Sequence, residues 1–364
     1  MKAGIVGLPN VGKSTLFNCL SNAKAQSANY PFCTIEPNMG VVNVPDTRLN
    51  KLEELVSPER VVPATVEIVD IAGLVKGASK GEGLGNQFLA NIRETDAILH
   101  VLRCFENENI THVDNSIDPV RDKETIDIEL QLKDLETVEK KLEKVARAAR
   151  TGQKEAQREE SLLKTIKKGL EEGKSVRALE FDEEEYLEYV KPLQLITDKP
   201  VMYVCNVEES AAVTGNAFVD KVREAVKDEE AEVLVLAVAT EADINELEDF
   251  EERQMFLEDV GLDEPGSSKL IRSAYKLLNQ QTYFTAGKKE VRAWTVNIGA
   301  TAPQAAGVIH TDFEKGFIRA EVIAYDDYVK YGSEAKVKEA GKMGVEGKNY
   351  IVKDGDVMHF LFNV

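Results

Sequence analysis

The stretch from Gly7 to Ser14, GLPNVGKS, decides the fold expected of this chain. It matches the pattern G-x-x-x-x-G-K-[ST], and it lies between a short apolar run at residues 3–7 and the helix-like segment TLFNCLSNA. The two glycines permit a backbone wrap whose N–H groups point at phosphate oxygens, and the N-terminus of the following helix adds a favourable dipole. The pattern therefore predicts a phosphate-binding loop between a strand and a helix.

The side chains in and around this loop predict a magnesium–triphosphate site. Lys13 is expected to reach the β- and γ-phosphate oxygens, and the Ser14 hydroxyl to bind Mg²⁺. In VEIVDIAG, an apolar strand ends at Asp70, whose carboxylate can hold the metal shell, and the Gly73 N–H can sense a γ-phosphate. Thr34, in the intervening loop NYPFCTIEPN, is expected to complete the metal site. This is the switch arrangement of GTPase-type P-loop proteins.

Two features of the loops bear on the rate of hydrolysis. Leu74 follows the DxxG glycine, where Ras-like proteins carry a glutamine that orients water, so intrinsic hydrolysis is expected to be slow. The glycine-rich stretch after Asp70, GLVKGASKGEGLGNQF, predicts a mobile loop. Asn10 has two interpretations: its carbonyl lies beside the phosphates and helps to bind K⁺, or it is a simple turn residue.

The rest of the chain predicts three regions. The strand candidates VVNVPD, VEIVDIAG, AILHVLRCF, KPVMYVCN and EVLVLAVAT alternate with loops and helical stretches, which favours a mostly parallel α/β sheet. Apolar residues spaced by three and four, with charges between them, predict a coiled-coil-like helical hairpin inserted into that sheet. EVRAWTVNIG, GFIRAEVIAY, KNYIVKDGD and VMHFLFNV predict a small mixed β domain. The expected boundaries are 1–122 with 193–278 for the α/β domain, 123–192 for the insertion and 279–364 for the C-terminal domain.

Composition limits the environment and the partners. The net charge of −19 argues against a general nucleic-acid binder and against DNA, so any RNA or ribosome contact needs local basic patches. The four cysteines have no metal-ligand spacing and are expected to be free thiols in a reducing compartment. No apolar run is long enough to span a membrane and the N-terminus is not signal-like, so a cytoplasmic protein is expected.

A degraded base-reading motif follows the strand VMYVC. Guanine-specific switches place N-K-x-D here, but this chain has Asn206-Val-Glu-Glu209, with valine for the lysine and glutamate for the aspartate. The guanine reader is thus weakened while a carboxylate remains nearby. The spacing does not by itself choose adenine.

Taken together, several segments resemble the YchF, or Obg-like ATPase, family. They are GLPNVGKST, NYPFCTIEPN, VDIAGLVKGASKGEGLGN, RCFENENITHV and TYFTAGKKEVRAWTV with GATAPQAAGVIHTDFEKGFIRAEVIAY, and they extend over essentially the whole chain. The resemblance implies an α/β P-loop NTPase domain, an inserted helical coiled-coil hairpin and a C-terminal TGS domain with a β-grasp, ubiquitin-like fold. It also implies a preference for ATP over GTP, slow hydrolysis and association with ribosomes.

The resemblance also assigns site residues. Asn206 is expected to contact adenine with Val207 beside it, Phe105 to pack near the base, and His112 to assist hydrolysis or to be a loop histidine without a chemical role. The catalytic residues expected are Lys13, His112 and Asn10. The nucleotide contacts expected along the P-loop are Asn10, Val11, Gly12, Lys13, Ser14 and Thr15.

The function expected is therefore a Mg²⁺-dependent switch ATPase that binds ribosomes and hydrolyses ATP slowly, with K⁺ as a second cation if Asn10 binds one. Two alternatives stay open. One is a dual-specificity or GTP-specific hydrolase, and the other is an interaction scaffold whose bound nucleotide is rarely turned over.

Overall fold

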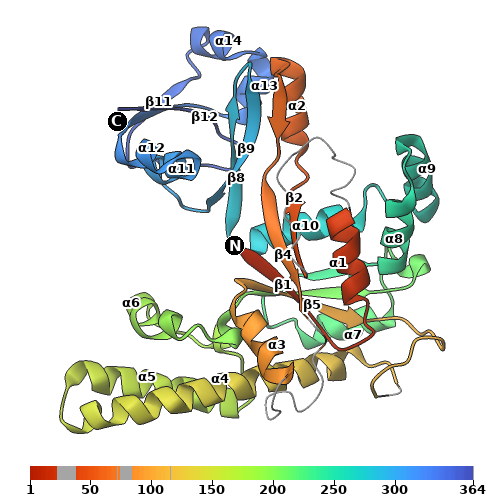
Figure 1. The fold of residues 1–364 in the computed structure, drawn as a ribbon, viewed down its shortest axis with the longest axis vertical. Coiled ribbons are helices and arrows are strands. Elements are labelled where there is room, and N and C mark those ends of the chain that lie inside the picture. The colour runs from red at the N-terminus through yellow and green to blue at the C-terminus, as the bar shows by residue number, and fades with distance from the viewer. Residues whose placement is uncertain (23–37, 72, 74–83, 115, 364) are drawn as a thin grey trace. The chain divides into compact units, whose positions relative to one another are not determined.

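The structure, a computed structural model, describes residues 1–22, 38–71, 73, 84–114 and 116–363 (Figure 1). The chain divides into two compact units. Of the described residues, the N-terminal unit contains 1–22, 38–40 and 67–270, and the C-terminal unit contains 41–66 and 271–363. The boundaries between the units fall inside two strands, β2 and β4, and inside helix α10.

The N-terminal unit is built on a six-stranded sheet with the order β2-β4-β1-β5-β6-β7. From β4 to β7 all neighbouring strands are parallel, as the alternating sequence pattern predicts. The strands are β1 (Lys2–Val6), β2 (Met39–Asn43), β4 (Thr65–Asp70), β5 (Ala97–Arg103), β6 (Val201–Asn206) and β7 (Val233–Leu236).

The central strands form the core of this unit. Every residue of β5 and of β6 is buried, because a parallel sheet with helices on both faces leaves neither face to solvent. The parallel arrangement brings the carboxyl ends of β1, β4, β5 and β6 to one edge of the sheet, and in register Arg103 lies opposite Asn206. Ligands of open α/β sheets bind outside this edge.

Helices and short turns complete the N-terminal unit. The helices outside the insertion are α1 (Lys13–Asn22), α3 (Leu84–Arg93), α7 (Ala217–Ala225), α8 (Val238–Glu246), α9 (Phe250–Val260) and α10 (Gly266–Leu277). The short segments are η1 (Val176–Ala178), α6 (Glu183–Glu185), η2 (Tyr186–Val190), η3 (Lys191–Leu193), η4 (Ile196–Asp198) and η5 (Glu209–Ala211).

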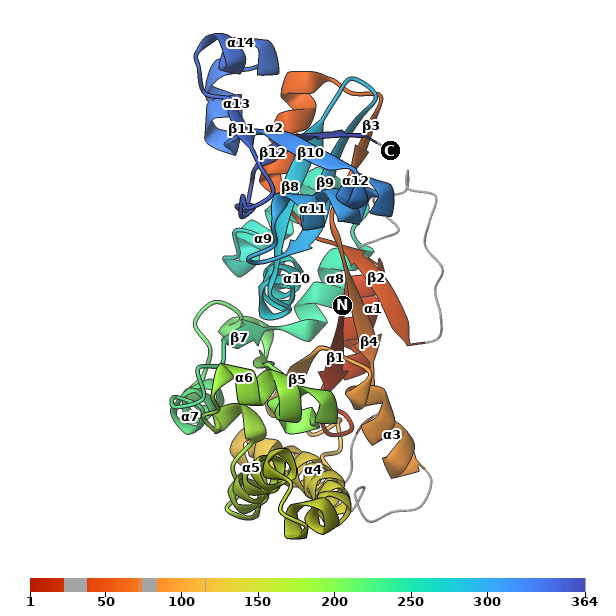
Figure 2. The same cartoon turned by 90° about the vertical axis from the view of Figure 1, so that its left-hand side faces the viewer.

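The expected helical hairpin is present as α4 (Pro119–Arg150) and α5 (Lys154–Glu171), which lie side by side (Figure 2). The Asp118 side chain accepts hydrogen bonds from the first N–H groups of α4, and proline at the first helical position suits the fixed φ of that turn. The core of the hairpin includes Val138 and Val145 of α4 and Leu163 and Ile166 of α5, and residues of the turns that follow pack with them.

The C-terminal unit contains a mixed six-stranded sheet with the order β11-β10-β12-β8-β9-β3. Its strands are β3 (Arg60–Val62), β8 (Gln280–Ala286), β9 (Glu290–Asn297), β10 (Phe317–Ile323), β11 (Gly344–Glu346) and β12 (Val357–Phe362). Its helices are α2 (Thr47–Val56), α11 (Ala302–Ile309), α12 (Thr311–Lys315), α13 (Tyr325–Tyr331) and α14 (Glu334–Glu339). Tyr283, Val296, Ala305, Phe317 and Phe360 belong to its core.

Two sequence expectations differ from the structure. Residues 41–66, expected within the α/β domain, pack with the C-terminal strands, since β3 pairs in parallel with β9 and the Arg48 guanidinium bonds Asp354. Strand β3 has only three residues, which is too short for the alternation of its side chains to be recognised in the sequence. The segment KNYIVKDGD is not a strand, and only Ile351 forms an isolated bridge, to Thr301. Apart from 41–66, the expected domain boundaries stay a prediction.

None of the helices in the described part of the chain has the length and apolar character needed to cross a bilayer.

Candidate nucleotide-binding site

The loop between β1 and α1 has the backbone geometry that the glycine pattern predicts. Gly12 has φ +101° and Asn10 has φ +62°, both in the left-handed region, and the first helical hydrogen bond runs from Leu16 N to Gly12 O at 2.9 Å. A Cβ atom at Gly12 would lie 2.5 Å from the Asn206 Nδ2 atom. Glycine is therefore required here both for φ and for the close approach of Asn206.

Lys13 lies at the inner end of the loop. It is buried, and its Nζ donates to the carbonyl of Leu8 at 2.8 Å. Burial lowers the pKa of Lys13 to about 8, against the opposing attraction of Asp70. A Cβ atom at Gly73 would be 3.2 Å from Lys13 Nζ, so this glycine lies directly beside the ammonium group. The motif lysine and the DxxG glycine thus meet, as a shared phosphate site requires.

Ser14 and Asp70, which the sequence predicts as metal ligands, are in direct contact. The Ser14 hydroxyl donates to Asp70 Oδ2 at 3.0 Å, and burial raises the pKa of Asp70. The other carboxylate oxygen, Oδ1, is buried and has no hydrogen-bond partner among the described residues. An unpartnered carboxylate oxygen beside a hydroxyl is the oxygen donor set that a hard cation prefers, so these residues fit Mg²⁺. Thr34, the third expected ligand, lies outside the described residues.

Asn206 connects three elements at the carboxyl edge of the sheet. Its side chain is buried, its Nδ2 donates to the Val11 carbonyl of the P-loop at 3.0 Å, and its Oδ1 accepts from Val238 N at the start of α8 at 3.1 Å. A primary amide has two N–H donors, and within the described residues only one of them is used. The structure therefore gives Asn206 a positioning role that sequence reasoning missed, and leaves one donor.

The residues after Asn206 are directed to other parts of the unit. Val207 is buried, and its N–H bonds the Leu236 carbonyl. Glu208 accepts from Asn216 Nδ2, and Glu209 accepts from the Thr240 hydroxyl at 3.5 Å. An apolar side chain is thus buried where a guanine reader carries its lysine.

Arg103 is a buried residue of this edge that the sequence patterns did not reveal. Its guanidinium donates to the carbonyls of Phe105, Asn107 and Ile110 and lies over the Phe105 ring at 4.8 Å. It therefore fixes the loop that carries Phe105. The one signal in the sequence is an arginine at the end of the strand AILHVLR, whose other residues are apolar apart from His100.

His112 is buried, and both of its ring nitrogens have partners. Nδ1 accepts from Asp114 N at 3.1 Å, which makes Nε2 the donor to Asp122 Oδ2 at 2.8 Å. The orienting partner that the sequence did not reveal is thus Asp122. The preceding carbonyl, Thr111 O, accepts from Asn10 Nδ2 at 3.1 Å, so the histidine loop contacts the P-loop.

The structure thus brings most of the expected residues together at one edge. Asn10, Val11, Lys13, Ser14, Asp70, Gly73 and Asn206 are joined by the contacts above, and Thr15 is exposed on α1. A glycine loop between a strand and a helix, with a lysine and a strand-end aspartate, defines the class of P-loop nucleotide-binding proteins.

Comparison with known proteins narrows the class to a family. Residues 2–207 match the family described as "50S ribosome-binding GTPase", and residues 280–363 match YchF-GTPase_C, described as "Protein of unknown function (DUF933)". The chain is 59% identical to the "Ribosome-binding ATPase YchF" of Haemophilus ducreyi, over 100% of this chain and 99% of that protein. It is 55% identical to the protein of the same name from Bacillus subtilis, over 100% of both.

A solved structure agrees with the sequence comparison. The Schizosaccharomyces pombe YchF GTPase superposes with a TM-score of 0.90 at 38% identity, over 99% of this chain and 97% of that one. This chain belongs to the YchF family. The expected fold class, a P-loop G domain with mixed α/β sheets and a separate C-terminal domain, is confirmed.

Proposed function

We propose that this chain is a ribosome-binding ATPase that binds Mg·ATP at the carboxyl edge of the N-terminal sheet and hydrolyses it slowly. The name shared by the full-length relatives supports this activity. That shared name carries the choice of ATP, and the segment Asn206-Val-Glu-Glu209, which lacks the lysine and the aspartate of a guanine reader, is consistent with it. We further propose that the protein is cytoplasmic and that residues 279–364 are a TGS domain.

The phosphate chemistry follows from the residues around the loop. Lys13 places its ammonium against the β- and γ-phosphate oxygens, where positive charge matches the charge of the transition state. Ser14 and Asp70 would hold Mg²⁺, with Thr34, outside the described residues, proposed as a third ligand, and the bound ion would supply charge that offsets the phosphates. Gly73 brings its backbone N–H to the γ-phosphate, because no side chain keeps it from Lys13.

The base is held by the residues at the ends of β5 and β6. The remaining Asn206 N–H donates to a purine ring nitrogen, while Val207 and Phe105 supply apolar contact. Stacking on Phe105 accepts either purine, since it needs only a π-face. Arg103 keeps Phe105 in place. The preference for ATP over GTP therefore depends on the loss of side-chain acceptors for guanine rather than on a group dedicated to recognising adenine.

Slow turnover follows from Leu74, which lies outside the described residues and cannot orient water. We propose that His112 assists hydrolysis through Nδ1, which requires this nitrogen to leave its bond with Asp114 N while Asp122 continues to orient the ring. We also propose that Asn10 binds K⁺ through its amide oxygen, because its Nδ2 already bonds Thr111 O.

Calorimetry with ATP, GTP and their diphosphates tests the nucleotide. We expect ATP to bind at least about tenfold more tightly than GTP, a difference of about 1.4 kcal/mol. Equal or tighter binding of GTP would support the GTPase alternative instead. Turnover with and without K⁺ and purified ribosomes, together with co-sedimentation, tests the rest. Absence of hydrolysis under every condition would favour the scaffold, and absence of co-sedimentation would contradict ribosome binding.

Asn206→Ala tests the base site. We expect ATP affinity to fall about tenfold and the free energy of unfolding by about 1–3 kcal/mol, because the Val238 N–H and the Val11 carbonyl lose a buried partner. The control Asn50→Ala, at an exposed position of α2, should change neither. Unchanged ATP affinity in Asn206→Ala would remove Asn206 from the base site.

A further inference from the structure

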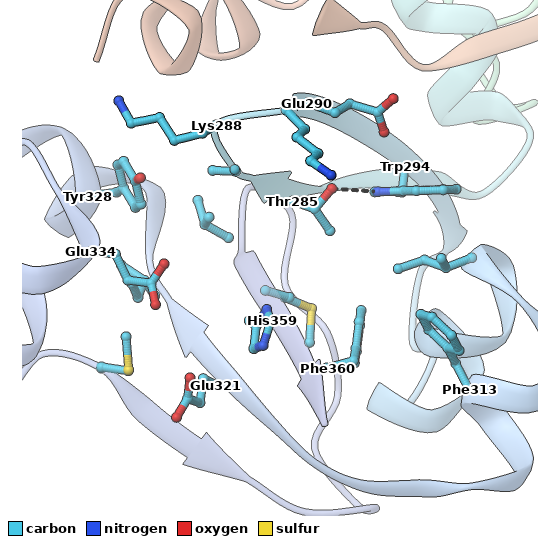
Figure 3. A pocket seen from close by; sticks show the side chains of 18 of the residues that line it. Thr285, Lys288, Glu290, Trp294, Phe313, Glu321, Tyr328, Glu334, His359 and Phe360 are labelled. Atoms are coloured by element: carbon cyan, nitrogen blue, oxygen red, sulfur yellow. Dashed lines mark hydrogen bonds between the residues drawn. The ribbon is translucent and has the colours of Figure 1, made fainter. Parts of the chain in front are cut away.

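The C-terminal unit contains a cavity of about 580 Å³, a volume typical of a ligand site (Figure 3). It is lined by the end of β8 and its turn into β9, by residues of β9, β10 and β12, and by residues of α11 to α14. The nucleotide chemistry proposed above involves none of these residues.

The cavity lies against the edge of a strand rather than on a face of the sheet. Four consecutive residues of β12, 357–360, all line it. Successive side chains of a strand point to opposite faces, so a cavity on one face would be lined by alternate residues only. The cavity is therefore a slot between β12 and the end of β8.

The strand pairing explains why the slot exists. β12 pairs with β10 along one edge, and β8 pairs with β9 along its far edge. Between β8 and β12 the described register is a single parallel pair, Val357 with Phe284. Beyond that pair β8 continues for only two residues before its turn into β9, whereas β12 continues to Phe362. The edge of β12 that faces away from β10 therefore has no described partner strand over its last residues, which is a template for strand addition.

One side of the slot is aromatic. Phe360 pairs with Ala320 across β10 and lies edge-on to Tyr283, which in turn stacks on Trp294, so all of them share one face of the sheet. Phe313 of α12 lies on this side with Trp294 (Figure 3). The Trp294 Nε1–H is already used, since it donates to the Thr285 hydroxyl at 2.9 Å. This side offers apolar contact.

The other side of the slot carries carboxylates. Glu321 lies opposite His359 in the β10–β12 register, one residue out of phase with Phe360, and so faces the opposite side of the sheet. Glu334 and Tyr328, from α14 and α13, line the same side (Figure 3). Of the lysines in the turn from β8 to β9, Lys288 donates to the Val56 carbonyl.

We propose that this slot binds an extended peptide as an added strand along the free edge of β12, with alternating apolar and basic side chains. The edge of β12 would bond the peptide backbone, the aromatic side would take the apolar residues, and Glu321 and Glu334 would take the basic ones. These two carboxylates give this side of the slot a local negative charge that attracts basic side chains. The same carboxylates repel phosphate groups, so the observations favour a peptide over a nucleic acid.

The chain provides its own probe for the test, because Trp294 is its single tryptophan and lines the slot. The full-length protein is titrated with the acetylated, amidated hexapeptide of alternating valine and lysine, a length of about 20 Å at a rise of about 3.3 Å per residue. Tryptophan fluorescence reports binding. We expect saturable binding of this peptide and at least about tenfold weaker binding of the valine–glutamate peptide.

Variants separate the parts of the proposal. Glu321→Lys and Glu334→Lys should each weaken the basic peptide about tenfold and favour the acidic one, whereas Glu339→Lys, exposed on α14 outside the slot, should change nothing. Methylating alternate peptide nitrogens on one edge should abolish binding if the backbone pairs. A methylated peptide that binds as well as the parent, an absence of saturable binding, or binding of single-stranded RNA in preference to the peptide would each overturn the proposal.

Discussion

The nucleotide edge of the N-terminal unit and the slot of the C-terminal unit are opposite kinds of site. At the nucleotide edge, polar side chains are buried and held by neighbouring elements, as Asn206 is held by the P-loop and by α8. In the slot, the side chains are mainly apolar, and the backbone groups open to a partner belong to the edge of β12. The first site is fixed before a ligand arrives, and the second offers an edge that a ligand completes.

This difference determines what substitutions should reveal. At the nucleotide edge, residues that touch phosphate affect turnover, and residues that hold the loops affect stability as well. In the slot, substitutions should change peptide binding and local stability while nucleotide turnover continues.

The largest expected effect is at Lys13. Lys13→Met keeps the aliphatic stem but removes the charge from the phosphates, so we expect ATP turnover to fall by about 10²- to 10³-fold while the thermal unfolding temperature changes little. Lys227→Met, at an exposed position, is the matched control. Turnover within a few-fold of the parent protein would show that the nucleotide edge does not depend on this charge.

Variants of His112 test whether its structural role, the bond to Asp122, can be separated from a role in ATP hydrolysis. His112→Ala leaves the buried Asp122 carboxylate short of a donor, so we expect a loss of about 2–3 kcal/mol in the free energy of unfolding, measured with urea. His112→Gln can still donate to Asp122 and should retain most of the stability while turnover falls. If the glutamine variant hydrolyses ATP at the parent rate, His112 acts only by holding its loop.

His100 should make the N-terminal unit sensitive to acid. It is buried on β5, where burial, with Lys123 and Arg177 nearby, lowers its pKa from 6.5 to about 3, against the opposing effect of Glu229. Below pH 6.5 the unfolded chain binds a proton that the folded chain does not, so stability falls as the pH falls. The loss between pH 6.5 and pH 5 is about 2 kcal/mol.

His100→Phe should remove that part of the pH dependence in urea titrations, and the exposed His310→Phe should keep it. An unchanged slope between pH 6.5 and pH 5 in His100→Phe would show that the histidine is not the group responsible.

The smallest expected effect is in the slot. Thr285→Val conserves shape but removes the acceptor of the Trp294 Nε1–H, which should cost about 0.5–1.5 kcal/mol and change tryptophan fluorescence. ATP turnover should stay at the parent value. A parallel loss of turnover would break the contrast between the two sites.

The sequence predicted the nucleotide edge far better than the slot. GLPNVGKS and VEIVDIAG are each a short continuous stretch whose residue types specify the local backbone conformation. The arrangement of Lys13, Ser14 and Asp70 therefore follows from the sequence pattern alone. The hydrogen bond from Asn206 to Val11 joins residues that are distant in sequence, and the contacts of Arg103 with the Phe105 loop depend on how that loop folds. No sequence pattern indicates either of them.

The sequence by itself determined the fold class, the phosphate loop, the helical hairpin and the loss of a full guanine reader, because each depends on local spacing of residue types. Only the tertiary structure decided that residues 41–66 pack with the C-terminal strands, that His112 bonds Asp122, and that β12 extends past its pair with β8 along the slot. Strand pairing and burial join distant residues, and their register depends on the packing of the whole sheet rather than on any single segment.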